Sequence, residues 1–85
     1  MNNYTIKYEK SAIKFLQKQP KNQQQRIIKS IESLPYVEGI KRLIGYKNTY
    51  RIRIGDYRAI YTIENDILLI KVVNIGNRGQ IYNKH

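Results

Sequence analysis

The feature that most constrains this chain is an alternation of apolar and cationic residues on both sides of a two-residue turn. Residues 50–61 read Tyr-Arg-Ile-Arg-Ile-Gly-Asp-Tyr-Arg-Ala-Ile-Tyr. Side chains of a strand point to opposite faces with period two, so Arg51 and Arg53 share one face while the isoleucines beside them enter a core. The run after the Gly-Asp turn returns Arg58 to the same place. The pattern predicts a hairpin that aims three guanidinium groups at something anionic.

The charge of the chain points to polyanionic partners. Sixteen Lys and Arg against six Asp and Glu give 85 residues a formal net charge of +10. The cationic residues are spread over the sequence, which argues against a basic tail added to a neutral fold. A field of this size attracts nucleic acid or an acidic protein segment. We assign residues 1–85 to one domain with a small core.

Composition also indicates the compartment. The sequence has no cysteine, so it has neither a disulfide nor a thiolate nucleophile, which fits the reducing cytosol. Its apolar runs are far shorter than the roughly 20 residues of a membrane span, and its first residues lack the pattern of a signal peptide. We expect a soluble, cytoplasmic protein with no membrane partner.

The first third of the chain predicts one strand and two helices. Residues 4–8 alternate as a strand whose Tyr4, Ile6 and Tyr8 share a face. Ser11 is expected to cap a helix from Ala12 to about Lys18, with Ile13 and Leu16 at helical spacing and Pro20 ending it. A second helix is expected to open at Asn22 and to end at Pro35, and its apolar residues recur at spacings of three and four: Ile27, Ile28, Ile31 and Leu34.

The remainder predicts a loop and three strands. We place a loop at residues 36–45, anchored by Leu43 and Ile44, and strands at about 49–54, 57–64 and 67–75, joined by short hairpin turns. The last strand is the most continuously apolar and is expected at the sheet centre. The predicted fold class is α+β, in the order β-α-α-β-β-β, with the helical hairpin packed on one face of a small, mainly antiparallel, twisted four-stranded sheet.

Three segments together resemble the RelE toxin family of bacterial toxin-antitoxin systems. These are Leu-Ile-Gly at 43–45, the run at 50–61 with its Gly-Asp-Tyr-Arg, and Ile-Gly-Asn-Arg-Gly-Gln-Ile-Tyr at 75–82. The resemblance covers nearly the whole chain, and it extends to the ParE toxins, which share the fold. The most specific part is the pairing of Gly-Asp-Tyr-Arg with the terminal Gly-x-Arg-x-x-Ile-Tyr.

The resemblance implies a ribosome-dependent endoribonuclease that cuts messenger RNA in the A site, using the 2′-hydroxyl as nucleophile. It implies as partners the ribosome, the messenger RNA and a RelB-like antitoxin with an acidic segment. Guanidinium groups suit the extra negative charge of a phosphorane. The implied catalytic residues are Arg51, Arg53, Arg58, Arg78 and Tyr82, and further RNA contacts are assigned to Lys41, Arg42, Lys47 and Asn77.

Structural roles for these residues stay open. Arg51 and Arg53 can be a solvated strand face that protects a sheet edge. Arg58 can pair with Asp56 or Glu64 at the surface. Tyr82 can pack the end of the chain onto the sheet, whereas Arg78, between glycines, is harder to explain as scaffold.

The sequence departs from the family where acid and base are assigned. Many members carry histidine or lysine before the terminal-loop arginine, where this chain has Asn77, and some carry lysines in place of Arg51 and Arg53. Arginine does not give up its proton, so the base candidates are Tyr82 and Lys47, and His85 is expected to be a frayed end. We expect catalysis by charge stabilisation and by ribosomal positioning, with weak acid-base help.

The sequence has no phosphate-loop motif and no zinc-ligand spacing, so we expect no cofactor and no metal. Two other functions remain open. A ParE-type toxin on the same scaffold inhibits DNA gyrase by protein contact, and a basic RNA-binding module holds phosphates without cutting.

Overall fold

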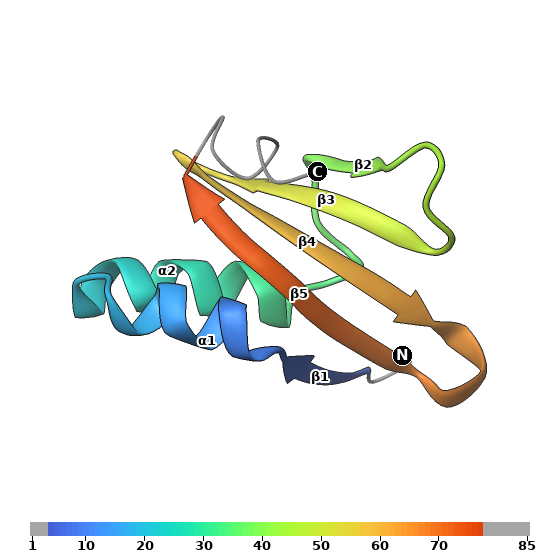
Figure 1. The fold of residues 1–85 in the computed structure, drawn as a ribbon, viewed down its shortest axis with the longest axis horizontal. Helices are drawn as coiled ribbons and strands as arrows, with labels where there is room; N and C mark the ends of the chain where they lie inside the picture. Colours follow the sequence, from blue (N-terminus) through green and yellow to red (C-terminus); the bar gives the residue numbers. More distant parts are fainter. Residues whose placement is uncertain (1–3, 78–85) are drawn as a thin grey trace.

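Two helices lie on one side of a five-stranded sheet in the computed structural model of the protein (Figure 1). The structure describes residues 4–77. In chain order the elements are β1 (Thr5–Tyr8), α1 (Lys10–Gln17), α2 (Lys21–Glu32), β2 (Ile40–Arg42), β3 (Thr49–Ile54), β4 (Tyr57–Glu64), a 3₁₀ helix (Asn65–Ile67) and β5 (Leu69–Asn77). Within this part of the chain, no helix has the length and apolar character needed to cross a membrane.

The sheet confirms the predicted α+β class but has one strand more than predicted. Its order is β1-β5-β4-β3-β2, with β1 parallel to β5 and the other neighbours antiparallel. The additional strand is β2, where a loop was predicted; it pairs Ile40 with Ile52 and Lys41 with Arg51. Because β2 occupies the outer edge of β3, the centre of the sheet is β4, and the prediction that the last strand is central is wrong.

The turns decide where the strands end. The hairpin strands β3 and β4 have the predicted bounds. Residues Asn65–Ile67 form a 3₁₀ helix instead of a two-residue turn, and Leu68 follows with a φ of 50°. As a result β5 begins at Leu69 and ends at Asn77, two residues later at each end than predicted.

The helices differ from the prediction at their N-termini. Glu9 is the N-cap of α1 and makes no side-chain capping bond. Ser11 lies inside the first turn, and its hydroxyl donates to the carbonyl of Val73, 2.7 Å away, which ties α1 to β5. α2 begins at Lys21 after Pro20, and Asn22 is its second residue. Proline is a natural helix start because its missing N–H is not needed there.

The core lies between the helices and the inner face of the sheet. Ile27 and Ile31 of α2 are fully buried, and in α1 the buried positions are Ala12 and Leu16, while Ile13 is 42% exposed. The sheet contributes residues that alternate along the strands, as the period-two pattern predicts; these include Ile52, Ile54, Tyr61, Ile70 and Val72. Tyr4, Ile6 and Tyr8 all pack against this core, as predicted.

Gly55 lies where the β3–β4 turn meets the helical layer. Gly55 has a φ of 58°, and a Cβ there would lie 2.8 Å from Nη2 of Arg26 in α2. Beside the same turn, the Phe15 ring of α1 meets the Tyr57 ring edge-on with centroids 5.9 Å apart. The helices therefore hold the hairpin close to its turn.

Replacing Ile27 by alanine is expected to lower the free energy of unfolding by about 2–5 kcal/mol, because a fully buried side chain is removed from a small core. Ile13→Ala, in the exposed row of α1, is the matched control and should cost below about 1 kcal/mol. Urea unfolding followed by circular dichroism measures both. Equal losses of stability from the two substitutions would contradict a core between α2 and the sheet.

Gly55→Ala is expected to lower the free energy of unfolding by roughly 1–2 kcal/mol, because an L-residue is strained at positive φ. Gly45 has a φ of 89° with no atom within 4 Å of its Cβ position, so Gly45→Ala measures the backbone strain alone. The two losses should be similar, since the Arg26 side chain can swing aside. A larger loss at position 55 that disappears in the Arg26→Ala background would instead show a rigid contact.

Candidate functional site

The face of the sheet opposite the helices carries the predicted arginines. Arg51 and Arg53 alternate along β3 with the core residues Ile52 and Ile54, so both lie on this face. We call it the open face because neither helix of residues 4–77 lies over it (Figure 1). Across the β3–β4 pair, Arg53 is directly opposite Arg58. Lys41 of β2 is opposite Arg51. We call these four residues, Lys41, Arg51, Arg53 and Arg58, the cationic cluster.

Arg58 is unusual among them because its side chain is buried. It is 9% exposed, and its Nε and Nη1 atoms have no hydrogen-bond partner. No ion pair joins it to Asp56 or Glu64 within residues 4–77, so the surface pairing considered from the sequence does not form. Burying guanidinium nitrogens without partners is costly. The position of Arg58 is therefore not explained by the stability of the fold.

The pairing of Arg53 with Arg58 adds to this cost. Like charges directly opposite each other on neighbouring strands destabilise a sheet. The other neighbour of Arg58 is Gly76 of β5, which has no side chain. A glycine inside a strand often marks the close approach of a ligand or another chain. The arrangement provides two adjacent guanidinium groups, one of them shielded from water, beside a glycine of β5.

Such a site is chemically suited to an anion with several oxygen atoms. Each guanidinium presents a planar set of donors that matches carboxylate or phosphate oxygens. A charge held in a low-dielectric environment interacts more strongly with an anion than one in water. The two guanidinium groups would therefore stabilise a bound anion more strongly if its negative charge increased during a reaction.

The remaining predicted residues are not all near this cluster. Arg42 pairs with Tyr50, whose ring stacks on the core residue Tyr61, so Arg42 lies on the other face of β2 from Lys41. Lys47 precedes β3 at the end of that strand away from Arg53. The four residue steps from Thr49 to Arg53 alone span about 13 Å. The structure does not bring Lys47 to the Arg53–Arg58 pair.

The C-terminal candidates divide into two groups. Asn77 is exposed at the end of β5 and pairs with Tyr57, one position from the pair formed by Arg58 and Gly76. Arg78 and Tyr82, together with His85, lie outside the described residues.

Tyr61 is not among the site residues predicted from the sequence. The Tyr61 side chain is fully buried, and its hydroxyl has no hydrogen-bond partner. Burial, and to a smaller extent the neighbouring Tyr50, raises the pKa of the Tyr61 phenol. Tyr61 therefore stays protonated at neutral pH, and it faces the helices, so it is no base for chemistry on the open face.

Metal binding finds no support in residues 4–77. No group of three or more His, Cys, Asp or Glu lies close enough there to hold an ion.

The family of the chain is established by its relatives. Residues 6–82 match the model of the ParE toxin of the type II toxin-antitoxin system parDE. A RelE-like toxin protein of Escherichia coli is 31% identical over 87 aligned positions, which cover 94% of this chain and 90% of that protein.

Solved structures agree with the sequence relatives. The archaeal RelE–RelB complex of Pyrococcus horikoshii contains a chain that is 30% identical, with a TM-score of 0.77 over 93% of this chain and 99% of that one. The isolated Escherichia coli RelE toxin shares the fold, with 23% identity and a TM-score of 0.71 over 95% of this chain and 93% of that one. On these grounds the chain belongs to the RelE/ParE superfamily of toxins from type II toxin-antitoxin systems.

Proposed function

We propose that this toxin is a ribosome-dependent endoribonuclease that cuts messenger RNA in the A site. The observation that carries the proposal is the Arg53–Arg58 pair, in which one guanidinium is buried with two unpaired nitrogens. The similarity to a RelE-like toxin supports the same function. A gyrase inhibitor that acts by protein contact has no need of a shielded, unpaired arginine.

The proposed reaction is attack of the 2′-hydroxyl on the adjacent phosphorus. A bond forms between the 2′-oxygen and phosphorus as the 2′-hydroxyl loses its proton, and the bond to the 5′-oxygen breaks as that oxygen gains a proton. The products are a 2′,3′-cyclic phosphate and a 5′-hydroxyl. The pentacoordinate intermediate carries additional negative charge on its equatorial oxygens. Arg53 and Arg58 stabilise that charge with donors fixed before the reaction begins, which is the most effective form of electrostatic catalysis.

The other members of the cationic cluster bind the RNA strand on one side of the scissile phosphate. Arg51 and Lys41 lie in the next row of the sheet, about 7 Å from the row of Arg53, which is close to the spacing of consecutive phosphates in an extended strand. Arg78 and Tyr82 are proposed to complete the site from the terminal segment, with Tyr82 near the attacking hydroxyl. Positioning by the ribosome supplies the remaining rate enhancement.

The neutralising partner is proposed to be an antitoxin with an acidic segment. The related Pyrococcus horikoshii chain was solved in a RelE–RelB complex. A net charge of +10 favours an acidic partner over a neutral one. Covering the cationic cluster would exclude RNA from it.

A second function stays in view because the family model that matches is that of the ParE toxin. Under this alternative the chain inhibits DNA gyrase by protein contact and cuts no RNA. The same open face would then bind protein.

Arg53→Ala is expected to reduce cleavage by roughly 100-fold or more, the usual loss when one donor to a developing oxyanion is removed. The assay uses ribosomes programmed with a defined messenger in the A site, followed by primer extension. Lys29→Ala removes one positive charge from an exposed position on α2 and should leave cleavage unchanged. Arg78→Ala and Tyr82→Phe test the terminal segment in the same assay.

Intact messenger with the unaltered toxin, together with gyrase-dependent breaks in plasmid DNA, would overturn the ribonuclease proposal in favour of the gyrase inhibitor. Binding of RNA without cleavage or gyrase inhibition would leave only the RNA-binding module.

Arg58→Met is expected to raise the free energy of unfolding by about 1 kcal/mol while it abolishes cleavage, because it replaces a buried, unpaired charge with an apolar side chain of similar length. Thermal unfolding of both proteins in the same buffer measures the change. Arg53→Met, at an exposed position, should change stability less. A loss of stability in Arg58→Met would show that the fold depends on this guanidinium.

A further inference from the structure

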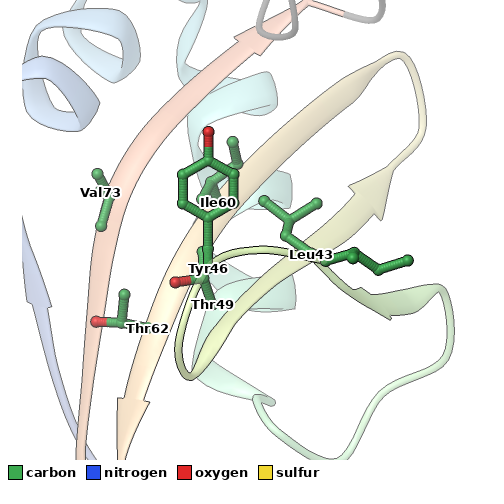
Figure 2. A pocket seen from close by; sticks show the side chains of 7 residues that line it. Leu43, Tyr46, Thr49, Ile60, Thr62 and Val73 are labelled. Atoms are coloured by element: carbon green, nitrogen blue, oxygen red, sulfur yellow. The ribbon is translucent and has the colours of Figure 1, made fainter. Parts of the chain in front are cut away.

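An apolar pocket opens on the same face of the sheet as the cationic cluster. Its volume is about 330 Å³, and its lining comes from the β2–β3 segment and from three strands. The lining residues are Leu43, Ile44, Tyr46, Thr49, Ile60, Thr62 and Val73. Figure 2 shows Leu43 and Val73 on opposite sides of the pocket with the Tyr46 ring between them. The volume is near the lower end of the roughly 300–1,000 Å³ of ligand pockets.

Local backbone geometry forms this pocket. After β2, the N–H of Leu43 donates to the carbonyl of Thr49, 2.9 Å away, and the chain between them turns at Gly45 and Asn48, both at positive φ. On the opposite side, an irregularity in the β4–β5 register lies beside Val73. The segment is thus held over the strands at one end of the sheet and leaves a hollow beneath it.

Two large apolar residues at the rim of the pocket are open to solvent. Ile44 is 97% exposed and Tyr46 is 53% exposed. Most large apolar side chains of a small domain are needed in its core, and clustered apolar exposure marks a binding surface. Ile44 contributes almost nothing to the fold by burial, so its position is better explained by a partner.

Cationic residues flank the pocket on two sides. In one row across the sheet, Ile60 is next to Arg51, which is next to Lys41. In the following row, Thr62 is next to Lys71, which is next to Lys7 of β1. Neighbouring strands are about 4.8 Å apart and rows about 7 Å apart, so carboxylates beside an occupant of the pocket would reach these charges. Glu64 lies one row further along β4, away from Arg51.

We propose that this pocket anchors one bulky apolar side chain of an acidic polypeptide segment, with carboxylates on both sides of that side chain bound by Arg51 and Lys71. The inference deepens the proposed function, because it names the contact by which a neutralising partner would hold the open face. Arg51 would serve both RNA and the segment, but the apolar lining is separate from the Arg53–Arg58 pair, so a substitution in the lining separates neutralisation from cleavage.

The lining favours a protein segment over a nucleobase. A base site needs aromatic faces for stacking and polar groups for the base edges. This pocket offers one tyrosine ring among aliphatic side chains and threonine methyl groups. Aliphatic side chains such as Leu43 and Ile44 match a leucine or phenylalanine better than a purine or pyrimidine.

Panning a phage library of random 12-residue peptides against the purified chain tests the inference while leaving the sequence of the partner open. We expect enrichment of acidic peptides that carry one leucine, isoleucine or phenylalanine flanked by Asp or Glu. A synthetic peptide of the enriched sequence should shift the methyl resonances of Leu43, Ile44, Ile60 and Val73, and its affinity should fall as salt rises.

The decisive variant is Ile44→Asp, which alters a solvent-exposed position and adds a repelling charge at the pocket. It should weaken the peptide by at least about tenfold in calorimetry. Ile67→Asp is the matched control, because Ile67 is 62% exposed in the 3₁₀ helix and lines no part of the pocket; it should bind as the unaltered chain does. Ile44→Asp should also cleave messenger normally while resisting inhibition by the peptide.

Three results would overturn the inference. Enriched peptides could lack the acidic and apolar pattern, they could bind Ile44→Asp as well as the unaltered chain, or a hexauridine oligonucleotide could shift the pocket methyls in an Ile44-dependent manner. Peptide binding is measured without any cleavage, so a chain that binds the peptide but cuts no RNA would refute the ribonuclease proposal alone.

Discussion

The antiparallel register of β3 and β4 determines both the core and the cationic cluster. With Ile52 opposite Ala59 and Arg53 opposite Arg58, one face of the pair is entirely apolar and the other gathers the arginines. A slip of one residue in either strand would move its arginines into the core and its apolar residues into water. The hydrophobic effect that selects the register therefore also places the guanidinium groups, and folding and charge placement cannot be separated in this hairpin.

The charge cluster is maintained against an energetic cost. Arg58 is buried beside a like charge with two nitrogens unpaired, and a small domain has only a few kcal/mol of net stability to offset such a site. The offset comes from fully buried side chains on the other side of the sheet, chiefly Ile27, Ile31 and Tyr61. Residues that lower the stability of the fold and make no compensating structural contact are expected at functional sites.

Sequence reasoning succeeded where a local pattern determines the structure. Alternation in residues 50–61 predicted which side chains face the helices, and the two hairpin strands have their predicted bounds. It failed where the structure depends on residues distant in sequence. Strand β2 is too short to show a periodic pattern and forms only by pairing with β3. In α1, Ala12 replaces Ile13 in the core because packing on β5 decides the orientation of the helix.

The same limit applies to the site. Charge and alternation were sufficient to propose Arg51, Arg53 and Arg58, whereas the burial of Arg58 depends on the packing around it. Lys47 and Arg42 are near Arg51 in sequence, yet the bend before β3 and the alternation of β2 place them elsewhere. The pocket could not be predicted, because it arises from a loop path and a strand irregularity that no short motif encodes.

Within residues 4–77, both helices lie on the same face of the sheet (Figure 1), and the proposed cleavage and the proposed neutralisation both use the opposite face. Both the cationic cluster and the apolar pocket lie on this face, and they meet in the row of Lys41, Arg51 and Ile60. An RNA strand uses the charges but gains little from an aliphatic hollow, whereas an acidic polypeptide uses both. A partner with the additional apolar contact can therefore displace RNA from shared charges even though each single ion pair is weak, and its advantage increases with salt, which screens the charges but not the apolar contact.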